Sequence, residues 1–305
     1  MKLVVLTTGL ALAGGLWPFG DKKDEPRSSD TIADLKAPKL ELRAEPTVSD
    51  SALLARQQYR AFLELAEGEP EMQLEAMRRL ADLSVEAAEN SDEAGAIEDQ
   101  FLVEAVTLYE QLLERNAEGA LRDAIIYQLA RAREFTGDND AALVALDQLI
   151  EEYPDSQFYD EAQFRRGEIL FVAKRYREAE TAYAAVIAMG QSSRFYEQSL
   201  YKNGWAFFKL GLHEESLDSF LGVLDRQLAG TEDPAAAIEA MSRPKRELVD
   251  DTFRVLAISF TYMEGADTLD QLMDRRPDLG YANLLYAGLG DLYLDKERYS
   301  DAAVT

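Results

Sequence analysis

The sequence has no cysteine and only one histidine, His213, among its 305 residues. The lack of thiols excludes disulfide bonds, a thiol nucleophile and thiolate metal sites. One histidine cannot supply a two-histidine metal motif, and we interpret His213 as a packing or surface residue in a turn. No glycine-rich phosphate-binding loop occurs. The sequence therefore predicts a protein that is not an enzyme, with no catalytic, cofactor-binding or metal-binding residues.

Basic residues are scarce as well. The chain has 32 Lys and Arg against 57 Asp and Glu, which gives a formal charge of −25. Binding to nucleic acid or to an anionic membrane depends on clustered positive charge. We therefore expect neither kind of partner. Apolar residues make up 47% of the chain, which is enough for a folded core.

The amino terminus lacks an apolar run of the about 20 residues that a membrane-spanning helix needs. Residues 1–13, with an end as late as about residue 19 left open, instead resemble a secretory signal peptide, since Lys2 precedes a short apolar stretch that fades by Trp17. Ala11-Leu12-Ala13 matches a signal-peptidase site. The sequence therefore predicts export.

Two features follow this segment. Residues 12–15 resemble the lipobox of bacterial lipoproteins, but Gly15 stands where the lipid-bearing cysteine would be, so no lipid anchor is predicted. Residues 14–50 are charged and contain four prolines, which predicts a flexible, disordered linker.

Residues 123–224 contain one pattern three times at a constant spacing of 37 residues. The copies begin at Asp123, Asp160 and Glu197. Apolar residues fall three and four apart in each copy, which predicts two amphipathic helices per unit. Small residues recur at fixed places, namely Ala130, Gly167 and Gly204 in the first helices and Ala142, Ala179 and Ser216 in the second. Such a repeat predicts an all-α protein, an α-solenoid of helix–turn–helix units.

The unit resembles the tetratricopeptide repeat (TPR). The residues that carry the resemblance are Leu129-Ala130, Gly137-Asp138, Ala142 and Pro154, then Gly167, Tyr176 and Ala179, then Gly204, Gly211, Phe220 and Leu224. The 37-residue spacing and the junction sequence from Glu151 to Phe171 resemble a narrower group. These are the TPR proteins of the Gram-negative envelope, such as the outer-membrane assembly lipoprotein BamD and the Tol-Pal-associated coordinator of cell division. One departure is that Arg166 and Asn203 replace the leucine seen at Leu129, which predicts a displaced apolar stripe.

The repeat is degenerate outside the three copies. We expect the solenoid to span residues 51–305, with weaker units near residues 74, 250 and 283 and insertions at 86–100 and 226–247. The last unit stops at Thr305, partway along its second helix. Since a repeat cannot bury its own apolar face, we expect a fragment of a longer protein or an end that packs on another chain.

The TPR resemblance implies that partners bind a groove lined by the first helices. The residues predicted to contact a protein partner are Arg131, Glu134, Glu168, Trp205, Lys209 and Asp291. Tyr127, Phe164 and Tyr201 share one column, and the displaced stripe favours a core role for them. Trp205, flanked by charge, has the composition of an interface anchor.

These features predict a non-enzymatic scaffold that binds protein partners of the bacterial cell envelope, in the periplasm, with an association with the outer membrane left open. Two alternatives stay open. The repeats would be the targeting half of a larger enzyme or secretion component whose functional domain lies beyond residue 305. Otherwise the chain would be a cytoplasmic TPR adaptor.

Overall fold

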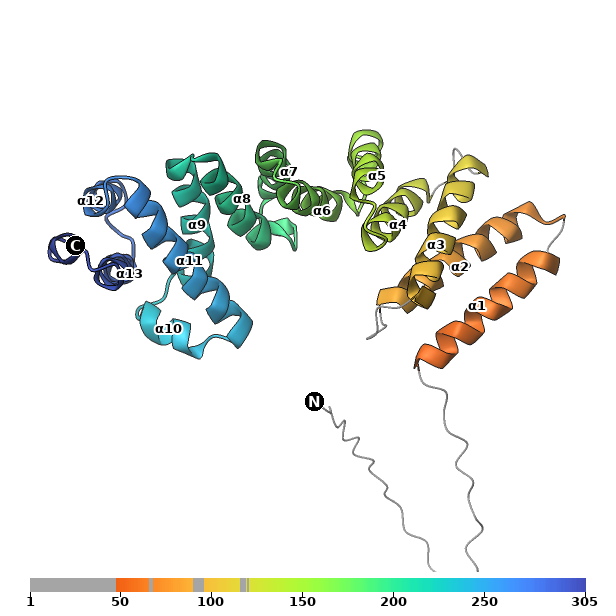
Figure 1. Cartoon of the computed structure of the whole chain (residues 1–305), viewed down its shortest axis with the longest axis horizontal. Coiled ribbons are helices and arrows are strands. Elements are labelled where there is room, and N and C mark those ends of the chain that lie inside the picture. The colour runs from red at the N-terminus through yellow and green to blue at the C-terminus, as the bar shows by residue number, and fades with distance from the viewer. Residues whose placement is uncertain (1–47, 66–67, 90–95, 116–118, 120) are drawn as a thin grey trace, which may run out of the picture. The chain divides into compact units, whose positions relative to one another are not determined.

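The computed structural model describes residues 48–305 except 66–67, 90–95, 116–118 and 120. The chain divides into two units, Met1–Glu45 and Pro46–Thr305, and the description covers the second. The predicted signal peptide and nearly all of the predicted linker lie outside the described residues. Every regular element in the described part is helical (Figure 1). The prediction of an all-α solenoid of hairpins is confirmed.

The helices follow one another along the chain, and most pack against their neighbours in sequence. Their bounds are α1 Val48–Leu65, α2 Pro70–Glu89, α3 Ala96–Arg115, α4 Arg122–Phe135, α5 Asn139–Glu152, α6 Tyr159–Val172, α7 Tyr176–Ala188, α8 Tyr196–Leu210, α9 His213–Leu228, α10 Pro234–Ala240, α11 Arg243–Tyr262, α12 Ala266–Arg275, α13 Ala282–Asp295 and α14 Tyr299–Ala302. The helices α4, α6 and α8 begin 37 residues apart, as do α5, α7 and α9. The three predicted copies are therefore the hairpins α4–α5, α6–α7 and α8–α9.

The turn inside each of these hairpins uses one left-handed residue. Gly137, Lys174 and Gly211 have φ values of 80°, 61° and 74°. This conformation ends the first helix and lets the second begin within a few residues. Lys174 adopts it without being a glycine, at a cost of roughly 1 kcal/mol.

The small residues of the first helices are matched to the large residues that pack on them. A Cβ atom added to Gly167 would lie 2.5 Å from Cε1 of Tyr183, and one added to Gly204 would lie 2.9 Å from Cδ1 of Phe220. In the first hairpin the same place holds Ala130 opposite Leu146, both buried. A glycine is therefore needed where an aromatic ring packs on the first helix. An alanine suffices where a leucine packs there.

The displaced apolar stripe has a visible cause. Leu129 is buried in the core. At the equivalent position Arg166 reaches the neighbouring helix and donates from Nε to Asp147 at 2.5 Å. Asn203 is buried beside Ser219, at 3.4 Å. Polar links between first and second helices thus replace the leucine contact.

The junctions after α5 and α7 are closed by the same three contacts. The Ser156 hydroxyl donates to Asp123 at 2.6 Å, and Ser193 donates to Asp160 at 2.7 Å. Each serine oxygen also accepts the backbone N–H two residues later. The ring at that residue then stacks on the first helix, Phe158 on Tyr127 at 4.6 Å and Phe195 on Phe164 at 5.0 Å between centroids.

The segments predicted as insertions contain helix. Residues 86–89 belong to α2 and residues 96–100 to α3, so each of these helices is 20 residues long. The segment 226–247 holds the end of α9, the short α10 and the start of α11. The weaker units near residues 74, 250 and 283 correspond to helices α2, α11 and α13.

Candidate functional site

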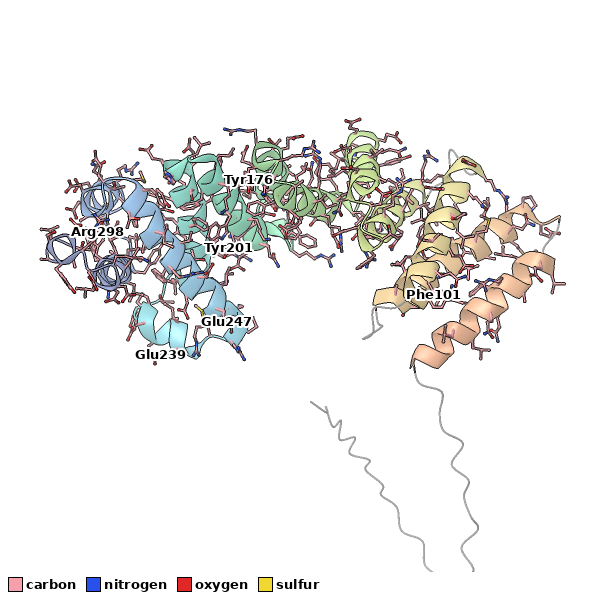
Figure 2. The ribbon with its side chains drawn as sticks, viewed as in Figure 1. Phe101, Tyr176, Tyr201, Glu239, Glu247 and Arg298 are labelled. Atoms are coloured by element: carbon pink, nitrogen blue, oxygen red, sulfur yellow. The ribbon has the colours of Figure 1, made fainter. Side chains whose placement is uncertain are left out.

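The helices α4, α6, α8 and α11 are linked in series by polar contacts between their side chains. Arg165 on α6 donates to Glu134 on α4 at 2.9 Å. Lys202 on α8 donates to Glu168 on α6 at 2.7 Å. Tyr201 on α8, labelled in Figure 2, donates its hydroxyl to Asp251 on α11. We call the side of these helices that carries the links the first-helix face.

Two of the residues predicted to contact a partner therefore hold the first-helix face together. Glu134 is one end of the link between α4 and α6. Glu168 accepts hydrogen bonds from the Lys202 ammonium and, at 2.5 Å, from the hydroxyl of the buried Tyr183. Burial and the Glu168 carboxylate together raise the pKa of Tyr183 well above its usual range. Both carboxylates are thus engaged within the chain.

Arg131 lies on α4 among aromatic rings. Its guanidinium carbon is 5.9 Å from the ring centroids of Tyr127 and Phe135, and Nη1 donates to Gln128 at 3.1 Å. Tyr127 is buried, which agrees with a core role, whereas Phe135 is 45% exposed. Arg131 and Phe135 thus form a cation–π pair on the first-helix face.

Trp205 belongs to a group of rings that we call the α8 aromatic cluster. Its members are Tyr201, Trp205, Phe208, His213, Phe220 and Tyr262. Trp205 is half-buried, with its ring 5.6 Å from Phe208 and 5.9 Å from Phe220 between centroids. The cluster begins at the fully buried Phe220 and ends at Tyr262, which is 66% exposed. Its contacts therefore run from the core to the surface.

The exposed end of the cluster was not predicted from the sequence. Tyr262 on α11 stacks on His213 at 5.1 Å and meets Phe208 edge-on at 5.5 Å. Nδ1 of His213 is buried without a hydrogen-bond partner among the described residues. The sequence predicts His213 in the turn of the third unit, where a TPR usually has an aromatic residue, but the structure places it at the first residue of α9. Nothing local connected it to Tyr262, 49 positions later.

The remaining predicted residues have different settings. The exposed Lys209 holds Nζ 5.9 Å from the centroid of the Trp205 ring, so it flanks the cluster with a positive charge. Asp291 is exposed on α13. The contacts among the described residues do not bring Asp291 together with the other five.

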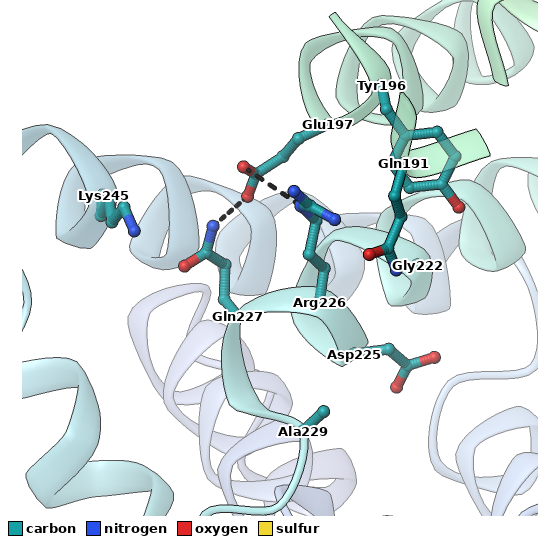
Figure 3. A pocket seen from close by; sticks show the side chains of 9 residues that line it. All are labelled: Gln191, Tyr196, Glu197, Gly222, Asp225, Arg226, Gln227, Ala229 and Lys245. Atoms are coloured by element: carbon teal, nitrogen blue, oxygen red, sulfur yellow. Dashed lines mark hydrogen bonds and ion pairs between the residues drawn. The ribbon is translucent and has the colours of Figure 1, made fainter. Parts of the chain in front are cut away.

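The α8–α9 hairpin also borders a polar cavity of about 500 Å³ (Figure 3). Glu197 lies above it, accepts a hydrogen bond from Gln227 and is 3.8 Å from Arg226. Asp225 accepts from Tyr281 at 2.6 Å and from Arg276 at 2.8 Å. Both carboxylates on this cavity are engaged by neighbouring groups, which suits a structural role.

None of the helices in the described part of the chain has the length and hydrophobicity of a membrane-spanning segment. Histidine and carboxylate side chains in the same part of the chain form no group of three or more suited to a metal ion. What this part of the chain offers is a row of helices with an aromatic cluster that reaches the surface.

These features define a class, the all-helical repeat protein whose binding surface is built from successive hairpins. Residues 123–156, which contain α4, α5 and the loop after them, match the tetratricopeptide repeat family model. The α4–α5 hairpin is thus a tetratricopeptide repeat. Repeats of this kind fit a scaffold for protein–protein interactions and typically have no catalytic role. No curated protein sequence matches the chain.

Several solved structures are similar to the chain at low sequence identity. BtubC (BKLC) from P. vanneervenii is 17% identical over 79% of this chain and 90% of its own, with a TM-score of 0.46. MamA is 16% identical over 59% of this chain and 94% of its own, with a TM-score of 0.45. A tetratricopeptide repeat protein from Parabacteroides merdae is 13% identical over 73% and 76%, with a TM-score of 0.42. At these values the matches assign neither a function nor a partner.

Proposed function

We propose that this chain is a non-enzymatic scaffold that binds protein partners of the bacterial cell envelope on its first-helix face. The observation that carries the proposal is the α8 aromatic cluster, which ends at the exposed ring of Tyr262 and has Lys209 against the ring of Trp205. Exposed aromatic side chains with a fixed geometry are the usual anchors of protein interfaces. The packed rings around Tyr262 hold it in place, so little side-chain entropy is lost on binding.

The envelope location rests on the amino-terminal sequence and on the resemblance of the 37-residue repeats to envelope TPR proteins. Residues 1–13 have the pattern of a secretory signal peptide. We further propose that the mature chain works in the periplasm, at or near the outer membrane. Sequencing the amino terminus of the protein from cells tests this point. A start near Gly14 is expected, and a retained Met1 would favour a cytoplasmic adaptor.

The binding face is tested by photo-crosslinking in cells that produce the full chain. A photo-reactive amino acid in place of Tyr262 should form an adduct with an envelope protein. The matched control carries the same amino acid in place of Val144, which is also 66% exposed but lies on α5. Adding Lys209→Glu should lower the yield of the adduct at position 262 several-fold.

The outcome that would contradict the proposed face is an equal yield of one adduct from both positions. Trp205→Ala is less informative as a first test. Its ring packs against Tyr201, Phe208 and Phe220, so the substitution would disturb the fold of α8 and α9.

A further inference from the structure

A second surface lies at the other end of the described chain, between α1 and α2. A groove of about 440 Å³ is lined by Gln58, Tyr59, Phe62, Met72, Glu75 and Ala76. Phe62 is 40% exposed and Met72 is 49% exposed. The groove is thus open to solvent and has apolar side chains on both walls.

The helix α1 is fixed against its neighbours by its opposite side. Arg56 is buried, donates from Nε to Ser84 on α2 at 3.0 Å, and pairs with Glu104 on α3 at 2.5 Å. Its guanidinium carbon also lies 3.4 Å from the ring centroid of Phe101. These contacts fix which side of α1 faces its neighbours, and therefore which side faces outward.

That outward side carries an apolar stripe. Leu54, Phe62 and Leu65 are spaced eight and three residues apart, which places them on one side of a helix. They are 54%, 40% and 83% exposed. A helix that is packed on one side and apolar on another is expected to be covered on both.

The repeat register indicates what kind of element would cover it. Met72 lies nine residues before the small residue Ala81, as Phe158 lies before Gly167 and Phe195 before Gly204. Phe158 and Phe195 each stack on an aromatic ring of the first helix of the preceding hairpin. Within the described residues no helix precedes α1. Met72 therefore has no contact there with the first helix of a preceding hairpin. The equivalent occupant would be a helix that presents an apolar or aromatic side chain to Met72.

The charges near the groove favour a basic occupant. Glu64 on α1 and Glu69 and Glu71 at the start of α2 are exposed. The nearby arginines are engaged, since Arg60 pairs with Glu104, while Arg78 and Arg79 both pair with Glu75, the carboxylate that lines the groove. An incoming helix with Lys or Arg beside its apolar stripe would meet complementary charge.

We propose that the α1–α2 groove binds an amphipathic helix of another protein, with a stripe of Leu or Phe flanked by Lys or Arg. The helix would take the place that a preceding first helix takes in the later hairpins, and would cover Leu54, Phe62 and Met72. This site is separate from the α8 aromatic cluster. The test of this site does not depend on the proposed envelope function.

The probe is a labelled 18-residue peptide with Leu on one helical face and Lys on the other, titrated against the full chain by fluorescence anisotropy. A matched peptide with Glu in place of Lys, and a scrambled Lys peptide of the same composition, should each bind at least about tenfold more weakly. Phe62→Asp with Met72→Asp should also weaken binding of the Lys peptide about tenfold or more. Both side chains are partly exposed, so the variant should keep the helical content and urea stability of the wild type.

Val144→Asp is the control variant, because it places one such charge on an exposed apolar side chain of α5, outside the groove. It should bind the Lys peptide as the wild type does. Equal binding of the Lys peptide to the wild type and to the groove variant would overturn the proposal, and so would equal binding of the Lys and Glu peptides.

Two other occupants would also overturn it, and each has its own readout. A wild type that dimerises in sedimentation velocity, with a monomeric groove variant, would show that a second copy fills the groove. Since the chain has no cysteine, Met72→Cys gives a single site for a polarity-sensitive dye. An emission already shifted to the blue in the monomer without peptide would show that the chain's own residues 1–47 fill the groove.

Discussion

The junctions after α5 and α7 are closed by a segment that directly follows each hairpin, whereas the junction after α9 is closed by residues 51 and 56 positions beyond Asp225. The first two use a Ser-x-Phe segment that returns to the start of its own hairpin. After α9 the equivalents of Ser193 and Phe195 are Gly230 and Glu232. The closing contacts there come instead from Arg276 and Tyr281, which both bind Asp225.

The difference shows what the Ser-x-Phe segment does. It supplies a hydrogen bond to an acidic side chain and a ring stacked on the first helix. A chain that repeats the segment keeps the 37-residue register. Where the segment is lost, α10 and α11 follow, and the ring position of Tyr127 and Phe164 is taken by Tyr201, which bonds to Asp251 instead.

The largest effect should come from removing a stacked ring. Phe195→Ala is expected to lower the free energy of unfolding by about 2 to 3 kcal/mol, since a half-buried phenylalanine loses its contact with Phe164. Urea unfolding followed by circular dichroism measures this. The control is Glu232→Ala at the equivalent place after α9, where the exposed side chain predicts a change within about 0.5 kcal/mol. Equal losses in both variants would show that the two kinds of junction do not differ in this way.

A smaller effect is expected from the serine of the same segment. Ser193→Ala removes the hydrogen bond to Asp160 and the acceptor for the N–H of Phe195, and should cost about 1 to 2 kcal/mol. Ser192→Ala is the control, because that exposed hydroxyl bonds only to the carbonyl of Met189. The same unfolding measurement applies. A control as destabilised as Ser193→Ala would contradict the role given to the buried serine.

The three regular hairpins could be predicted from the sequence because the residues that pack the two helices of each hairpin lie within that hairpin. The small residues Ala130, Gly167 and Gly204 and the large residues opposite them recur at one spacing. An amphipathic period and a column of small residues are enough to place two helices against each other. The two helices of each unit and the close contact between them follow from these two signals.

The contacts that join different hairpins could not be predicted in the same way. Arg165 follows Glu134 by 31 positions and Lys202 follows Glu168 by 34, so the two links share no register. Both glutamates were therefore predicted as free to bind a partner. Tyr262 reaches His213 only because α9 and α11 pack across a segment that breaks the 37-residue spacing. Spacing alone carries no information about such a contact.

The distant closure after α9 gives the third prediction. Tyr281 is buried and donates its hydroxyl to Asp225, so Tyr281→Phe should lower the free energy of unfolding by about 1 to 1.5 kcal/mol. The control is Tyr286→Phe, which removes a bond of the same chemistry to Asp270 at an exposed place and should cost less than about 0.5 kcal/mol. If both variants lose the same stability, burial of the Tyr281–Asp225 bond does not explain how this junction is closed.

The smallest effect tests the position that distinguishes the two kinds of junction, and it depends on pH. Burial and the hydrogen bond to Asp251 raise the pKa of Tyr201 to about 12. The pKa of tyrosine in an unfolded chain is about 10, so the neutral phenol stabilises the fold fully below pH 10 and progressively less as the pH rises to 12. Tyr201→Phe should therefore cost about 1 kcal/mol at pH 8, and the difference from the wild type should shrink between pH 10 and pH 12. Urea unfolding at pH 8, 10 and 11 measures this, with the exposed Tyr299→Phe as the control. A difference that stays constant across these values would show that the bond to Asp251 is not what replaces the phenylalanine stack.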